Sequence, residues 1–226
     1  MHRSVLYFIF IIAPLRVFAS DPLPTTSELR TFRDGFDQYQ GTTDVEIWAV
    51  SPNTCIEGNP NGSADADNDG GESQILIRFD RMVGPGPTQV PPNATILEAQ
   101  LVISAFDEGT TVHLHRMLVG WKSSATWNNM IGGVTADGME ASPQKDGFTF
   151  GKIAASSSSV SFDVTDTVQA WVNGAANHGW VFINTGGNGW DFYTSEHEIV
   201  EKRPVLIVRL KGTHREAGAQ AKGVGP

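Results

Sequence analysis

The stretch "ATILEAQLVISAF" (residues 94–106) alternates apolar with other side chains through most of its length. Ala99, Leu101, Ile103 and Ala105 occupy every second position. Because side chains two residues apart in an extended strand lie on the same face, these four define one apolar face. The stretch therefore predicts a long β-strand with one side in a hydrophobic core.

Shorter runs with the same period surround this strand and are separated by clusters of Gly, Pro, Asn and Asp. They are "TDVEIWA" (43–49), "QILIRFD" (74–80), "TTVHLHRML" (110–118), "VSFDV" (160–164), "GWVFIN" (179–184), "WDFYTS" (190–195) and "PVLIVRL" (204–210). Eight such runs with turns between them are typical of an antiparallel β-sandwich or barrel. The fold class predicted is all-β.

One segment, "DVTDTVQAWVNG" (163–174), breaks the alternation. Its apolar residues Val168, Trp171 and Val172 have helical spacing, and Thr165 or Asp166 could cap the first turn. Gly174 follows as a stop signal. We expect one short helix here.

The N-terminus has the pattern of a secretory signal peptide. An apolar run follows Arg3, and Val17-Phe18-Ala19 fits the small-residue rule for cleavage. The run is too short to span a bilayer. We expect a signal peptide at 1–19, a linker at 20–30, a β-domain at 31–211 and a disordered tail at 212–226. The expected location is extracellular or on the cell surface, with no membrane insertion after cleavage.

The charge of the chain limits its partners. Removal of residues 1–19 takes away Arg3 and Arg16 and no acidic residue, so 14 basic residues remain against 25 acidic ones, a net charge of −11. A protein this acidic has no general attraction for nucleic acid or anionic membranes. Cys55 is the only cysteine, which excludes an internal disulfide.

The acidic stretch "DADNDGGE" (65–72) allows two interpretations. Asp65, Asp67 and Asp69 have the spacing of the first ligands of a calcium loop, and Glu72 could add a fourth carboxylate. A structural Ca²⁺ would then stabilise a chain without disulfides. The alternative is a solvated acidic turn, because Asp and Asn favour turns and glycine accepts positive φ.

His113 and His115 fall on one face of a predicted strand, a spacing that suits a metal pair. With two nearby carboxylates they would make a hydrolase site. The alternative is a pair of histidines beside a sheet with no metal.

Sugar binding needs exposed aromatic faces with polar groups beside them, and arginine forks match uronate carboxylates. The candidates for glycan contact are Trp48, Arg78, Arg116, Lys122, Trp190 and Tyr193. Each aromatic residue has packing as its alternative role, and Arg78 has pairing with an acid such as Asp80.

Several motifs occur in the order seen in DNRLRE-domain proteins. They are "TFRDGFDQYQGTTD", "ILIRFD", "PPNATILEAQL", "HLHRML", "WKSSATWNN", "FDVTDTVQAWVNGAANHGW", "WDFYTSE" and "RPVLIV". The chain resembles this family over residues 31–210. DNRLRE domains are secreted bacterial modules similar to the carbohydrate-binding modules attached to alginate lyases and other polysaccharide-degrading enzymes.

The resemblance implies an antiparallel jelly-roll β-sandwich with one short helix. It also implies a non-catalytic module that holds extracellular or cell-wall polysaccharide, acidic or neutral, with a catalytic domain supplied by a separate partner protein. Two other functions stay open: a structural or adhesive surface protein that binds no glycan, and a secreted hydrolase.

Overall fold

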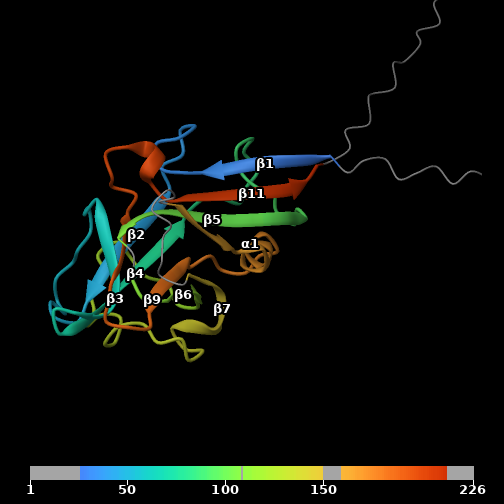
Figure 1. Ribbon diagram of the computed structural model, residues 1–226. Helices are drawn as coiled ribbons and strands as arrows, with labels where there is room; N and C mark the ends of the chain where they lie inside the picture. Colours follow the sequence, from blue (N-terminus) through green and yellow to red (C-terminus); the bar gives the residue numbers. More distant parts are fainter. Residues whose placement is uncertain (1–25, 108, 150–158, 213–226) are drawn as a thin grey trace, which may run out of the picture.

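The computed structural model describes residues 26–107, 109–149 and 159–212 (Figure 1). In chain order the strands are β1 (Ser27–Phe32), β2 (Thr42–Trp48), β3 (Asn61–Asn68), β4 (Gly71–Phe79), β5 (Ile96–Asp107), β6 (Val112–Met117), β7 (Ala141–Thr149), β8 (Ser159–Asp163), β9 (Trp180–Asn184), β10 (Trp190–Tyr193) and β11 (Val205–Lys211). A short helix, α1 (Thr165–Val172), follows β8, and a 3₁₀ turn, η1 (Val200–Lys202), precedes β11.

The strands form one strongly curled antiparallel sheet, in effect a half-barrel. Its order is β1-β11-β5-β10-β3-β4-β9-β6-β7, with β2 added to β4 and β8 added to β5. Figure 1 shows β1, β11 and β5 as one layer and β4, β9, β6 and β7 as another beneath it. Strands β3 and β10 join the two layers. The all-β antiparallel fold with one short helix predicted from the sequence is confirmed.

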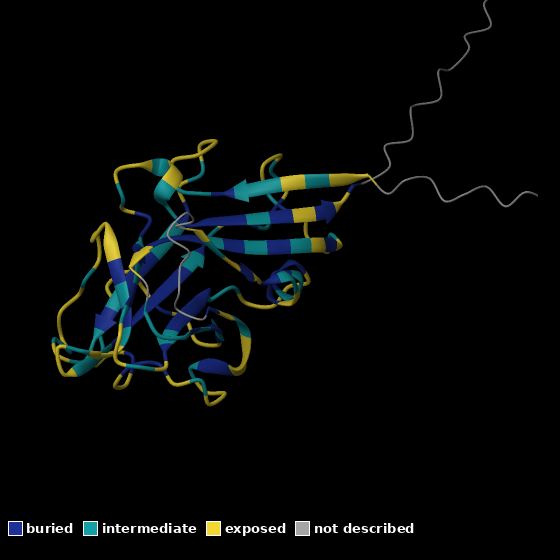
Figure 2. Cartoon of the chain, in the orientation of Figure 1, coloured by how far each residue is buried: buried dark blue, intermediate teal, exposed yellow. Residues whose placement is uncertain are grey.

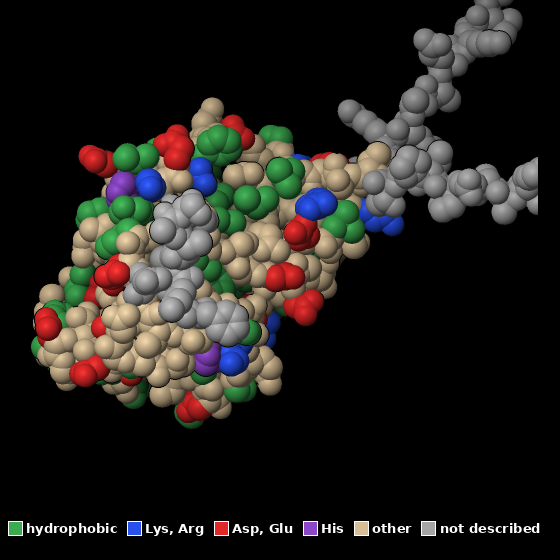
Figure 3. All heavy atoms as spheres, in the orientation of Figure 1, with side chains coloured by type: hydrophobic (Ala, Val, Ile, Leu, Met, Phe, Trp, Pro, Cys, Tyr) green, Lys and Arg blue, Asp and Glu red, His purple; other side chains and the backbone are tan. Residues whose placement is uncertain are grey.

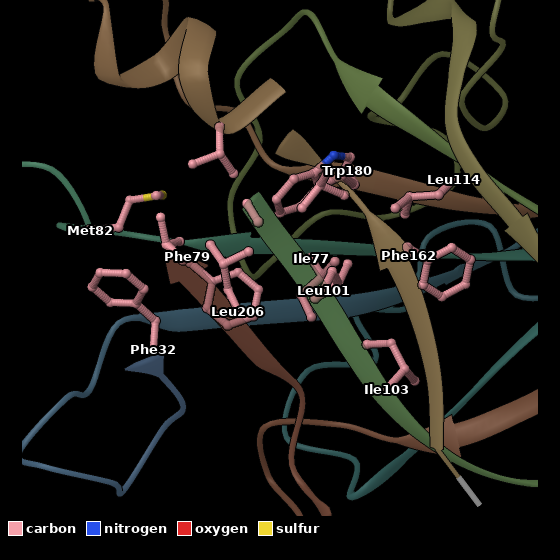
Figure 4. Packing of buried hydrophobic residues seen from close by; sticks show 14 of the residues in the cluster. Phe32, Ile77, Phe79, Met82, Leu101, Ile103, Leu114, Phe162, Trp180 and Leu206 are labelled. Carbon is pink, nitrogen blue, oxygen red and sulfur yellow. The ribbon is translucent and has the colours of Figure 1, made fainter. Parts of the chain in front are cut away.

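The main core fills the inside of this curl. The apolar face predicted for β5 lies there, with Ala99, Leu101 and Ile103 fully buried. Figure 2 shows the resulting alternation of buried and less buried residues along β5 and β11. Figure 4 shows how side chains of β5 pack against Leu206 and Phe162 from neighbouring strands. Strand β5 therefore pairs with other strands along both of its edges and packs into the core with its inner face.

A second apolar cluster covers the other side of the lower layer. The segment between β6 and β7 (118–140) folds back over it, and the cluster includes Val45, Leu76, Trp121, Met130 and Val181. As a result, Leu76 is buried although it lies opposite the inward-facing Ile75 and Ile77. This explains why five consecutive residues of β4 are buried, which is unusual for an antiparallel strand.

Helix α1 confirms the predicted helical segment, with one difference at its start. Val168, Trp171 and Val172 are buried in the main core, as their spacing predicted. The N-cap is Val164, with no side-chain cap. The hydroxyl of Thr165 instead donates to Asp163 and accepts from the N–H of Ala99, so it ties the helix to β5.

The predicted linker at 20–30 is wrong for residues 27–30, which form most of β1. The whole strand pairs with β11, from Ser27 opposite Lys211 to Phe32 opposite Leu206. Its pairing partner, β11, lies at the far end of the sequence, so no local sequence pattern indicated that these residues form a strand. The predicted signal peptide and nearly all of the predicted tail lie outside the described residues.

Candidate functional site

Alternate residues of β2 hydrogen-bond with strand β3 and with the segment that follows β10. The Asp44 carboxylate accepts the N–H of Ser195 (2.8 Å), and the Glu46 carboxylate accepts the N–H of Ser63 (3.2 Å). The indole of Trp48 donates to the carbonyl of Asn68 (3.1 Å). Trp48 is half-buried by this contact, and its role in the fold is to hold the end of β3.

Both carboxyls on this face have raised pKa values. Burial raises the pKa of Asp44 to about 6, against the hydrogen bonds from Ser195, which lower it. Burial likewise raises the pKa of Glu46 to about 7, and the nearby Asp191 adds to the rise. Asp44 bonds Ser195, two residues after Tyr193, and Glu46 bonds Ser63, which pairs with Asp191 in β10. The two carboxyls therefore hold the segments next to Tyr193 in place.

Trp190 is fully buried, and the prediction that it forms part of a sugar-binding platform is wrong. Its ring packs against Phe162, Phe182 and Phe192 inside the curl. In β10 the buried positions are Trp190 and Phe192, so the residues between and after them face outward. The alternation of the strand therefore puts Tyr193 outside and Trp190 inside.

Tyr193 does lie on an outer surface, within a group of side chains that we call the aromatic platform: Phe106, Tyr193, His197 and Lys202. The ring of Tyr193 is 4.8 Å from that of Phe106 and 4.2 Å from that of His197, centre to centre. The Lys202 ammonium lies 5.3 Å from the centre of the Tyr193 ring. Phe106 is 46 % exposed and offers the largest open ring surface of the group.

Polar groups border the aromatic platform. Asn61 lies opposite Tyr193 across the β3–β10 pair, and Asp107 lies opposite Asp191 across the β5–β10 pair. One oxygen of Asp191 is buried and has no hydrogen-bond partner among the described residues. Burial raises the pKa of Asp191, and repulsion from Asp107 and Asp65 adds to it. The exposed Phe106 ring and the partly exposed Tyr193 ring, beside an amide and carboxylates, suit hydroxyl-rich ligands.

Three of the four platform residues, Phe106, His197 and Lys202, were not predicted from the sequence. Phe106 ends the long β5 run on the face opposite Ala105, where alternation alone indicates exposure. His197 and Lys202 lie in the connection from β10 to β11, which has no periodic pattern. The guanidinium of Arg203 donates to the carbonyls of His197 and Asp34 and fixes this connection on the molecule.

The predicted basic residues do not meet at the platform. Arg78 pairs with Asp80 (2.6 Å), donates to the carbonyl of Trp121, and its guanidinium lies over the Trp121 ring. Lys122 is the exposed neighbour of Trp121, and Arg116 lies half-buried on β6. Figure 3 shows that basic side chains on the face in view lie singly or in small groups, some of them next to acidic ones.

The acidic stretch forms a tight hairpin between β3 and β4. Asn68 pairs with Gly71, and the two residues between them, Asp69 and Gly70, have φ of 50° and 90°. Positive φ at both central residues defines the type I′ turn, in which Asp-Gly is favoured. Asp67 donates its N–H to the Asp65 carboxylate, and Glu72 accepts from Gln74.

The two histidines share a face, as expected, with ring centres 5.9 Å apart. His115 is buried and its Nδ1 contacts the Ser142 carbonyl, while His113 lies beside Lys145. Burial lowers the pKa of His113, and the charge of Lys145 adds to this effect. Within residues 26–107, 109–149 and 159–212, no three His, Cys, Asp or Glu side chains gather closely enough to hold a metal ion.

No family model matches the chain, and no curated protein is significantly similar to it. The resemblance to DNRLRE-domain proteins therefore stays a prediction. In the described part of the chain, no helix has the length and apolar character needed to cross a membrane.

Proposed function

We propose that this protein is a secreted, non-catalytic carbohydrate-binding module whose contact surface is the aromatic platform. The observation that carries the proposal is the contact between Phe106 and Tyr193 on the outer side of β5 and β10, with Asn61 and Asp191 beside them. Aromatic rings stack on the C–H faces of sugar rings, and neighbouring amides and carboxylates bind their hydroxyls. The jelly-roll sandwich implied by the resemblance belongs to the same proposal.

The charges around the platform favour a neutral polysaccharide over an acidic one. Asp107 and Asp191 lie beside the rings, and their carboxylates would repel a uronate. Four arginines that could have bound uronates already pair with acids; they are Arg30, Arg78, Arg203 and Arg209. Lys202 is the basic group at the platform itself. The proposed partner is therefore a hydroxyl-rich glycan, with an enzyme on a separate chain as the second partner.

Retardation in native gels that contain soluble polysaccharide tests the proposal. We expect neutral glucan or galactan to slow the protein and alginate or pectin to do so less. The double change Phe106→Ala and Tyr193→Ala is expected to weaken retardation at least tenfold, because it removes both stacking rings. Phe148→Ala is the matched control, since Phe148 is 50 % exposed but lies on β7 at the far end of the sheet.

Two results would contradict the proposal. If none of these polysaccharides retards the unaltered protein, a structural or adhesive surface protein becomes the better interpretation. If the Phe148 variant loses as much retardation as the double variant, stacking at the platform is not the cause. Thermal melts of both variants show whether any loss reflects unfolding.

The structural calcium ion predicted at Asp65, Asp67, Asp69 and Glu72 needs its own test. The type I′ hairpin accounts for the Asp-Gly pattern without a metal, so we expect equal melting temperatures in calcium and in chelator. A ligand that binds only the folded state raises its stability. A melting temperature raised by calcium and returned to the chelator value by Asp67→Ala would instead establish the calcium site.

A further inference from the structure

A second concave site lies next to the end of β1 and shares no residue with the aromatic platform. It is a cavity of about 420 Å³ lined by residues 37–40 and 87–89, by Arg81, and by Thr31 and Phe32 of β1. Cavities that bind small molecules are typically of roughly 300–1,000 Å³. Two loops far apart in the sequence therefore border a half-open hollow large enough for one sugar ring.

The backbone around this cavity is held in an unfavourable conformation. Asp37, Gln38 and Arg81 have φ of 46°, 61° and 56°, and they are three of the six non-glycine residues with positive φ in the described chain. Left-handed backbone is unfavourable for an L-residue, and Gln and Arg lack the local hydrogen bonding that helps Asn and Asp tolerate it. Such strain often marks a ligand site.

Hydrogen bonds between the loops fix the cavity walls. The Arg81 guanidinium donates to the Gln40 carbonyl, and the Gln89 amide donates to the Arg81 carbonyl. The Gly86 N–H donates to the same Gln89 side chain. The Tyr39 ring packs edge-on against Phe32 with centres 5.3 Å apart, and its hydroxyl donates to the Asp80 carbonyl. The walls are therefore set before any ligand binds.

The side chains around the cavity define the chemistry of its ligand. The lining residues with an amide or hydroxyl side chain, groups that can both donate and accept, are Gln38, Gln40, Thr31 and Thr88, together with Gln89, whose amide already bonds Arg81 and Gly86. The opposite charges of Asp37 and Arg81 balance, so the cavity favours neither an anion nor a cation. Sugar hydroxyls also both donate and accept, and the half-buried Tyr39 ring adds an apolar surface beside them.

We propose that this cavity binds a single neutral pyranose residue, separately from the aromatic platform. The inference rests on the proposed function only for the choice of sugars as ligand class. A module with a cavity and a platform can hold one chain at two points, which raises the effective affinity for a polymer.

Amide shifts in heteronuclear NMR test the proposal, with methyl glucoside, methyl galactoside, N-acetylglucosamine and glucuronate as probes. We expect a neutral sugar to shift amides of residues 37–40 and 87–89. Arg81→Gly and Gln38→Gly remove cavity side chains and relieve the strained φ. Gln38→Gly is expected to melt no lower than the unaltered protein, and Arg81→Gly somewhat lower because it also loses the hydrogen bond to Gln40. Both variants are expected to bind the sugar at least tenfold more weakly.

Asn93→Gly is the control variant, because Asn93 is also exposed at a positive φ of 61° but does not line the cavity. It should bind as the unaltered protein does. The proposal is overturned if no neutral sugar shifts these amides, if only glucuronate does, or if both cavity variants bind normally. Sugar binding in the Phe106 and Tyr193 double variant separates the two sites: the cavity should still bind there, even if the platform function fails.

Discussion

Lowering the pH from 8 to 5 is expected to make this protein more stable. Asp44 and Glu46 are the cause, because burial raises their pKa values from 3.8 to about 6 and from 4.5 to about 7. The native state therefore binds protons more tightly than the unfolded chain. Between the unfolded and native pKa values, free energy of unfolding falls as pH rises. The full cost applies above pH 7 and disappears below about pH 4.

The size of the effect follows from the shifts. A pKa difference of one unit corresponds to 1.36 kcal/mol, so each carboxyl accounts for roughly 3 kcal/mol between the two limits. Burial lowers the pKa of His113, and this group acts in the opposite direction as the pH falls below about 6.5. Its effect is smaller because His113 is only partly buried. The rise on acidification should therefore persist to about pH 5.

Urea unfolding at pH 5, 6, 7 and 8 measures this directly. In the double variant Asp44→Asn and Glu46→Gln, each amide oxygen can still accept the N–H of Ser195 or Ser63. The variant should thus be the more stable protein at pH 8 and should lose most of the pH dependence. Parallel pH curves for the two proteins would show that these carboxyls are not the source.

The strand pattern could be predicted because alternation reflects burial on one face, as in Ala99, Leu101 and Ile103. Strands without that signal were missed: most of β1, whose partner is the distant β11, β3, whose outward face is acidic, and β7, whose buried and exposed residues do not alternate. The residues of the aromatic platform could not be predicted in this way. Alternation could not show which outward residues meet, and Tyr193 reaches Phe106 and Lys202 only through the sheet order and the β10–β11 connection.

The burial of Trp190 shows the same limit of the alternation pattern. Trp190, Asp191, Phe192 and Tyr193 alternate, but two large aromatic residues occur on one face and one on the other. Only the position of β10 between β5 and β3 decides that the Trp190 face closes the core. Pattern gives the two faces of a strand, and the sheet order decides which of them faces the core.

Gly179→Ala is expected to prevent stable folding. Gly179 has φ of 73°, and a Cβ there would lie 2.0 Å from the Ile77 carbonyl oxygen and 2.8 Å from the Arg78 Cα of β4. Both contacts are with backbone, so no side chain can move to make room. Gly179 immediately precedes β9 and faces β4 on one side. On the other side its carbonyl accepts the N–H of Met117 in β6. Relief would require β9 to separate from β4.

Gly174→Ala is the control that separates crowding from backbone conformation. Gly174 has φ of 103°, and a Cβ there would meet nothing within 4 Å. Its cost is that of the conformation alone, about 1–2 kcal/mol. For Gly179→Ala we expect a loss of at least about 4 kcal/mol in guanidinium unfolding, or no folded protein. Equal losses of stability in the two variants would contradict the prediction. They would mean that β9 can move away from β4 at little cost, so the close approach at Gly179 is not needed for folding.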